Sequence, residues 1–180
     1  MIKLVNGFTK DNYTCNYYQE SSINDLAKKH SINSLKVFHH NIDSFGKNNS
    51  DLISNLECLN FSFDIICLTE VRKTNAEIIK MVFPDYHIFL ENPNTAKGGV
   101  ALLLRKIKFN NITELDHSTG YDLKNKCNCM HCKIENKWLR FNINNQSVII
   151  GGIYRHPKGD IQHFNDALKM LLNINDDTTL

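Results

Sequence analysis

Short apolar stretches separated by polar loops follow one another from residue 35 onward, and they predict a series of β-strands. Leu35–Ile42 begins with alternating apolar positions, while Asp64–Thr69 is almost continuously apolar, as in a strand buried on both faces. Further strands are expected at Tyr86–Leu90, Val100–Arg105, Trp138–Ile143 and Val148–Tyr154, with a weaker candidate at Lys108–Leu115. The Asn144-Asn145 pair between two of them is typical of a hairpin turn.

Three other stretches carry apolar residues at helical spacing. They are Leu52–Leu59, Ile78–Val82 and Ile161–Leu172. Ser50 or Asn49 is the expected N-cap of the first helix. Thr74 and Glu77 form a capping-box pattern before the second helix, which Pro84 ends. The order of strands and helices predicts an α/β sandwich with its helices on the outside.

The first 33 residues differ from the rest of the chain. They are polar, rich in Asn, Tyr and Ser, and have no sustained hydrophobic period. We therefore expect residues 1–33 to be a poorly ordered leader that packs little against the rest, with a short helix at Ile23–Lys29. Residues 34–180 then form the domain, and its polar, cysteine-bearing stretch Asp116–Glu135 is expected to be a loop.

Composition limits the classes of protein to consider. The chain has 180 residues, of which 42% are hydrophobic and 22% charged, and this suits one globular domain. Its net charge is only +2, so a nucleic-acid-binding surface would have to be a local basic patch. The N-terminus lacks the apolar region of a signal peptide, and the apolar runs are too short to span a bilayer. We expect an intracellular protein that makes no membrane contact.

A group of cysteines in the predicted loop is a candidate zinc site. Cys127, Cys129 and Cys132, together with His131 or His117, could supply four ligands in a tetrahedral arrangement. The spacing departs from the usual pair of Cys-x-x-Cys motifs, and the chain has no second pair of that kind. Exposed thiols on a variable loop are the favoured interpretation.

Polar side chains stand at the ends of three predicted strands. Asn41 lies near the end of the first strand, Glu70 follows Asp64–Thr69, and Tyr154 and Arg155 end the last strand. Strand ends meet at one rim in such folds, so these side chains are expected to lie together. A carboxylate there could hold Mg²⁺, and a guanidinium suits phosphate. Each residue also has an ordinary interpretation as a loop, cap, core-flanking or surface residue.

The ordered set of motifs HNI, FDIICLTE, KGGVALLLR and VIIGGIYRHP resembles the endonuclease/exonuclease/phosphatase superfamily, and within it the endonuclease domain of non-LTR retrotransposons. The resemblance covers about residues 35–172. It implies a deoxyribonuclease-I-like fold, a four-layer α/β sandwich of two sheets flanked by helices. It also implies that Asn41 is the active-site Asn, that Glu70 binds Mg²⁺ or Mn²⁺, and that Tyr154 contacts the scissile phosphate, with Arg155 and Asn41 as phosphate ligands.

The activity that this resemblance implies is metal-dependent hydrolysis of a phosphodiester, which in retrotransposons nicks DNA. A reverse transcriptase domain is expected downstream in a full-length element, and nuclear location is implied by the family alone. No residue matches the family's Asp-x-Asn segment, its C-terminal Asp or its general-base His, because the chain stops after Leu180. We therefore expect a fold that is incomplete at its C-terminus, with no or only trace nicking. The alternatives are a non-catalytic remnant of the domain and a superfamily phosphatase that acts on small phosphate esters.

Overall fold

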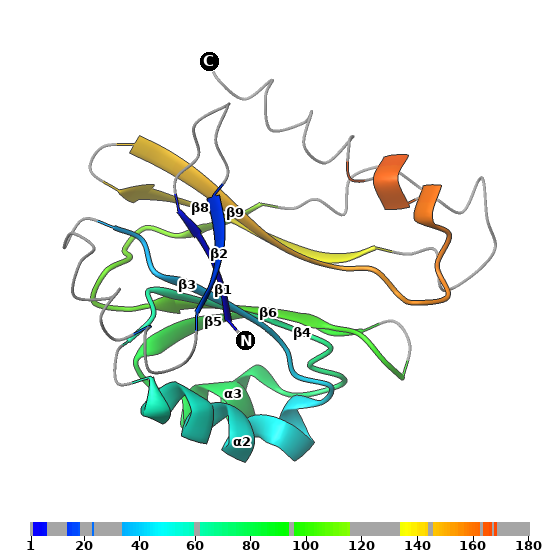
Figure 1. Ribbon diagram of the computed structural model, residues 1–180, viewed down its shortest axis with the longest axis horizontal. Helices are drawn as coiled ribbons and strands as arrows, with labels where there is room; N and C mark the ends of the chain where they lie inside the picture. Colours follow the sequence, from blue (N-terminus) through cyan, green and yellow to red (C-terminus); the bar gives the residue numbers. More distant parts are fainter. Residues whose placement is uncertain are drawn as a thin grey trace.

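The computed structural model describes residues 2–6, 14–18, 23, 34–59, 62–93, 96–115, 134–143, 146–162, 164–166 and 168. Within them, two β-sheets lie face to face, and a pair of helices covers the outer side of one sheet (Figure 1). The elements of this body are β3 (Val37–Asn41), α2 (Phe45–Cys58), β4 (Ile65–Thr69), α3 (Ala76–Val82), β5 (Tyr86–Glu91), β6 (Val100–Arg105), β7 (Thr113–Leu115), β8 (Glu135–Ile143) and β9 (Gln146–Tyr154).

The sheet next to the helices has four strands in the order β3-β4-β6-β5. β3 runs parallel to β4, and the other pairs are antiparallel. All five residues of β4 are buried, because this strand has neighbours on both edges and covered faces on both sides. Asn41 pairs with Thr69 in the register, so β3 and β4 end at the same edge of the sheet.

The second sheet has the order β7-β8-β9 and is antiparallel throughout. β8 and β9 form a long hairpin that pairs Ile143 with Gln146 at its closed end and Glu135 with Tyr154 at its open end. The strands predicted around the Asn144-Asn145 pair are therefore confirmed, and both begin earlier than predicted. The weaker candidate at Lys108–Leu115 is a strand only over Thr113–Leu115.

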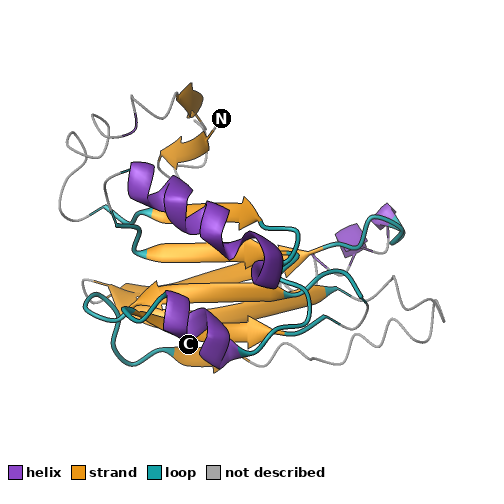
Figure 2. Ribbon diagram, turned by 90° about the horizontal axis from the view of Figure 1, so that it is seen from below, coloured by secondary structure: helices purple, strands orange, loops and turns teal. Residues whose placement is uncertain are grey.

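Two hydrophobic cores lie on either side of the four-stranded sheet. Figure 2 shows the sheets and helices around them from below. Alternate residues of β4 contribute to each core, as the period of two requires. Ile66 and Leu68 face the helices, whereas Ile65 and Cys67 face the second sheet. The core between the sheets consists of Ile65, Cys67, Leu102, Leu104, Phe109, Leu139 and Phe141. This arrangement explains the continuous apolar run that predicted a strand buried on both faces.

The two sheets are in close contact where β9 lies against β4 and β6. A Cβ atom at Gly152 would lie 2.7 Å from Cγ1 of Val100 and 3.1 Å from the sulfur of Cys67. No side chain fits there without a shift of its neighbours, so glycine permits the contact. The close approach brings the end of β9 next to the ends of β3 and β4.

Both helices begin elsewhere than predicted. α2 starts at Phe45, with Ser44 as its N-cap residue, so the predicted N-caps at Ser50 and Asn49 are wrong. No side chain caps α2, because backbone contacts from the loop after β4 hold its first residues. α3 is capped by Asn75, whose side chain accepts a hydrogen bond from Glu77 N, so the predicted capping box that starts at Thr74 is also wrong.

The structure describes parts of the first 33 residues. β1 (Ile2–Asn6) and β2 (Thr14–Tyr18) form a separate antiparallel pair, which the sequence did not predict, and Ile23 is buried in the core beneath the helices. That residues 1–33 as a whole pack little against the rest stays a prediction. In the predicted helix Ile161–Leu172, residues 161–162, 164–166 and 168 are helical. Cys127, Cys129 and Cys132 lie outside the described residues, as does His131.

No helix among the described residues is both long enough and apolar enough to cross a membrane.

Candidate active site

Asn41 and Glu70 meet at the edge of the sheet where β3 and β4 end. Asn41 is the last residue of β3, and Glu70 directly follows β4. The side-chain amide of Asn41 donates a hydrogen bond of 2.9 Å from Nδ2 to Oε1 of Glu70. Asn41 is exposed and Glu70 is half-buried, so this pair lies at the surface. Two residues that the sequence analysis selected separately are thus in direct contact.

Tyr154, the last residue of β9, comes to the same place from the second sheet. Its hydroxyl is buried and faces Glu70, although no hydrogen bond to any described residue meets ordinary limits of distance and angle. Burial raises the pKa of Tyr154 to about 12; Glu70, through its charge and as a hydrogen-bond acceptor for the phenol, and the charge of Glu135 act in the same direction. An effect of this kind requires the phenol to lie close to Glu70. The hydroxyl therefore keeps its proton at neutral pH and can donate it in a hydrogen bond to a ligand.

The loops after β3 and β4 brace each other through their backbones. Ser44 N donates to Glu70 O over 2.7 Å, and Phe45 N donates to Val71 O over 3.1 Å. Several non-glycine residues of these loops have a left-handed backbone: Asp43 (φ 43°), Ser44 (φ 98°), Glu70 (φ 56°) and Arg72 (φ 57°). Such residues each cost about 1–3 kcal/mol and gather at functional sites. The strain is concentrated around the carboxylate that was predicted to hold a metal.

Asp43 and Arg72 add a charged pair beside Glu70, which the sequence analysis missed. Arg72 Nη2 lies 2.5 Å from Oδ1 of Asp43. This hydrogen bond and the Arg72 charge, helped by Lys97 and Lys47, lower the pKa of Asp43. The cations that surround this aspartate form a local basic patch on a chain of low net charge. The available signal was the position of Asp43, two residues after Asn41 in the same strand-end loop.

Glu135 is a second residue that sequence analysis missed, because it was placed in the predicted loop Asp116–Glu135. It is the first residue of β8, is only 5% exposed, and stands opposite Tyr154 in the hairpin. Its Oε2 accepts a hydrogen bond from the backbone N–H of Gly99, at the start of the β6 strand in the other sheet. A buried carboxylate therefore joins the two sheets directly behind the Glu70 and Tyr154 pair.

Arg155 points to its own loop. Its Nη1 donates to Gly159 O over 3.0 Å and to His156 O over 3.4 Å. These bonds position the segment after β9 and occupy one end of the guanidinium. The phosphate contact expected of Arg155 stays a prediction.

The donors at this rim suit a hard divalent cation. Mg²⁺ prefers oxygen ligands and usually keeps several waters while it binds one or two carboxylates and a substrate phosphate. Glu70 offers one half-buried carboxylate, which Asn41 orients. In the described part of the chain, no group of three or more His, Cys, Asp or Glu residues could hold a metal ion.

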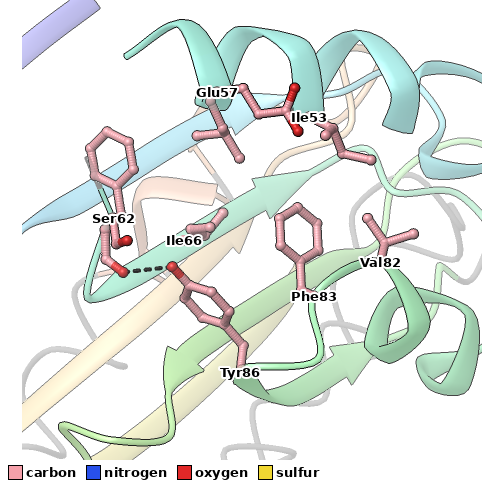
Figure 3. Close-up of a pocket in the computed structure, with 9 residues that line it drawn as sticks. Ile53, Glu57, Ser62, Ile66, Val82, Phe83 and Tyr86 are labelled. Carbon is pink, nitrogen blue, oxygen red and sulfur yellow. Dashed lines mark hydrogen bonds between the residues drawn. The ribbon is translucent and has the colours of Figure 1, made fainter. Parts of the chain in front are cut away.

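A groove lies on the helix-covered face of the four-stranded sheet, away from the rim around Glu70. This groove has a volume of about 490 Å³ and lies between α2 and the segment from α3 to β5 (Figure 3). Seven of its nine lining residues are aliphatic or aromatic, and the Tyr86 hydroxyl donates to Phe63 O at one side. Glu57 is its single ionisable acid. It lacks convergent polar groups, so the rim around Glu70 is the better candidate for chemistry.

No family model matches the sequence, and no curated protein is similar to it. Solved structures do match its fold. A humanized TDP2 of D. rerio matches with a TM-score of 0.53 and 17% identity, over 77% of this chain and 58% of that one. D. rerio TDP2 complexed with a single-strand DNA product matches with a TM-score of 0.54 and 16% identity, over 80% of this chain and 55% of that one.

An AP endonuclease from Archaeoglobus fulgidus also matches, with a TM-score of 0.45 and 21% identity, over 78% of this chain and 49% of that one. The two TDP2 structures share the two-sheet α/β fold of this chain, so the predicted fold class is confirmed. The chain spans somewhat more than half of the length of those TDP2 chains.

Proposed function

We propose that this chain is the metal- and phosphate-binding part of a retrotransposon-type endonuclease domain, which hydrolyses DNA phosphodiesters with Mg²⁺ or Mn²⁺. The observation that carries the proposal is the meeting of Asn41, Glu70 and Tyr154 at one rim, from three strands and two sheets. The motifs around these residues are those that resemble the retrotransposon branch. A reverse transcriptase downstream and a nuclear location belong to the same proposal.

Each of the three residues has a distinct role in this proposal. Glu70 holds the cation through its carboxylate, and Asn41 fixes that carboxylate through the 2.9 Å hydrogen bond. The bound cation supplies charge stabilisation at the scissile phosphate. Tyr154 donates its hydroxyl proton to a phosphate oxygen, which the raised pKa makes possible at any pH well below about 12. No residue of the chain matches the family's base His or Asp-x-Asn segment, so we propose this rim as one half of a site.

DNA is the proposed substrate because the cations near the rim are suited to a phosphate backbone. Arg72, Lys97 and Lys47 lie close enough to Asp43 to lower its pKa. Phosphate contacts of this kind provide most of the non-specific affinity of proteins for DNA. One TDP2 structure of the same fold was solved with a single-strand DNA product, and that likeness supports the choice of DNA over small phosphate esters.

The test combines metal binding with nicking. We expect Mn²⁺ to bind the chain, as measured by electron paramagnetic resonance, and Glu70→Ala to abolish the tight site. Nicking of supercoiled plasmid under single-turnover conditions should be weak, depend on Mg²⁺ and be absent in Glu70→Ala. Glu57→Ala is the matched control, since Glu57 is an exposed glutamate on α2, away from the rim.

Three results would count against the proposal. Mn²⁺ affinity that is the same in Glu70→Ala and in the parent would remove the metal site. Glu70-dependent Mn²⁺ and DNA binding without any nicking would favour the non-catalytic alternative. Release of phosphate from small monoesters, with plasmid left intact, would favour the phosphatase.

A further inference from the structure

Glu135 occupies a demanding position for an ionised side chain. It is 5% exposed, and a buried carboxylate is costly unless hydrogen bonds and charges compensate for its lost hydration. One such bond comes from the backbone N–H of Gly99, across the gap between the two sheets. This hydrogen bond joins the first residue of β8 to the residue before β6, so it places the carboxylate at a defined point between the sheets.

The Gly98-Gly99 segment, which donates this hydrogen bond, also accepts hydrogen bonds from the turn after Glu70. Gly98 O accepts a hydrogen bond of 2.8 Å from Arg72 N, and Gly99 O accepts one of 3.4 Å from Val71 N. Both glycines have a left-handed backbone, with φ of 110° and 86°. A Cβ atom at Gly98 would overlap the Glu135 carboxylate, so the segment fits around this side chain.

A continuous path of contacts therefore runs from Glu135 to the proposed metal ligand. The carboxylate fixes Gly99, the Gly98-Gly99 segment fixes Val71 and Arg72, and the turn that they form sets the left-handed backbone of Glu70 at φ 56°. The same carboxylate stands opposite Tyr154 in the β8–β9 pairing.

We infer that Glu135 is a positioning residue that sets the Glu70 carboxylate for the cation and the substrate phosphate. The inference rests on the proposed function of Glu70. Glu135 acts through the Gly98-Gly99 segment and does not touch the phosphate itself. The hydrogen bond with Gly99 needs an oxygen acceptor at the right distance and does not need a negative charge.

Two variants separate the position of the acceptor oxygen from its charge. Glu135→Gln keeps an oxygen acceptor at the same distance but removes the charge. We expect it to keep the Mn²⁺ affinity of the parent. Glu135→Asp keeps the charge but falls one methylene short, and it should weaken Mn²⁺ binding roughly ten- to a hundred-fold, as loss of a ligand's support typically does.

Glu114→Gln is the control, because it removes a carboxylate from the same sheet, where Glu114 pairs with Lys137 over 2.6 Å. It should leave Mn²⁺ affinity unchanged. The inference is overturned if Glu135→Asp folds and binds Mn²⁺ as the parent does, or if Glu135→Gln weakens Mn²⁺ binding as much as Glu135→Asp does. If Glu135→Asp does not fold, Glu135→Met, which keeps the length of the side chain and removes the acceptor, takes its place.

Failure of the proposed function has a different signature. In that case Glu70→Ala leaves Mn²⁺ affinity unchanged, and the positioning role of Glu135 is lost with it. A Glu70-dependent Mn²⁺ site that neither Glu135 variant alters would refute only the role of Glu135.

Discussion

At the scale of single residues, Tyr154 combines two properties that a purely structural tyrosine avoids. Its hydroxyl is buried without a hydrogen bond of ordinary geometry to any described residue. Glu70 and Glu135 both oppose its ionisation, and Glu70 is near enough to act on it as a hydrogen-bond acceptor. A phosphate oxygen placed beside the hydroxyl would provide an acceptor of better geometry.

The titration of Tyr154 gives a stability prediction. Its pKa is raised from 10.0 in the unfolded chain to about 12 in the fold, so the protonated form is favoured by folding. Its contribution to stability is complete below pH 10 and is lost as the pH rises toward 12. We expect the free energy of unfolding, measured with urea at several pH values, to fall more steeply over this range in the parent than in Tyr154→Phe. Equal slopes would contradict the prediction.

The sequence was sufficient for some residues of the site and not for others. Asn41, Glu70 and Tyr154 could be found because each stands at the end of a strand and within a recognisable motif. Glu135 could not, because its importance comes from a contact with Gly99, 36 positions away, that no local pattern encodes. The left-handed backbone of Glu70 likewise depends on bonds to other loops.

At the scale of elements, the strands were more predictable than the starts of the helices. β6 has the predicted bounds because all but one of its residues are buried, and the buried apolar run is visible in the sequence. α2 begins seven residues before Leu52. The sequence did not predict this start, because the residues between Phe45 and Leu52 are a glycine and polar side chains, exposed or half-buried, that show no hydrophobic period. Hydrogen bonds to Glu70 O and Val71 O fix this start, and they form only once β4 is in place.

Two glycines with opposite surroundings test the packing of these elements. Gly152→Ala would push a methyl group against Val100 and Cys67, and such overpacking typically costs about 1–3 kcal/mol. Gly46 in α2 has no atom within 4 Å of a built Cβ, so Gly46→Ala should stabilise by about 0.4–1 kcal/mol. Thermal unfolding should show opposite shifts. A Gly152→Ala protein as stable as the parent would mean that the sheets lie further apart at this point.

At the scale of the whole molecule, charge is distributed unevenly. The net charge is only +2, yet the cations around Asp43 gather beside the rim where the two sheets meet. A protein of this kind should bind DNA weakly over most of its surface and more strongly at this patch. The proposed substrate would then be oriented by the same few cations that attract it.

The salt dependence of DNA binding measures this patch. Each phosphate contact that a cation makes contributes a slope of about −0.9 to the dependence of log K on log salt for duplex DNA. Arg72→Gln should therefore make the slope shallower by about one contact, because Arg72 is partly exposed beside Glu70. Arg105→Gln, at the far end of β6, is the control and should leave the slope as it is. If Arg72→Gln and Arg105→Gln changed the slope equally, the DNA would not be bound at the patch beside Glu70.

The backbone bracing of the two strand-end loops has a consequence for how such a protein can diversify. Main-chain hydrogen bonds carry no information about side-chain identity, so the curvature of the rim can survive replacement of the residues that decorate it. Substitutions at Lys73 and Lys47, which are exposed, would then alter target preference without disturbing the position of Glu70. Exposed side chains at the rim can therefore change during evolution while the backbone keeps the Glu70 carboxylate in place.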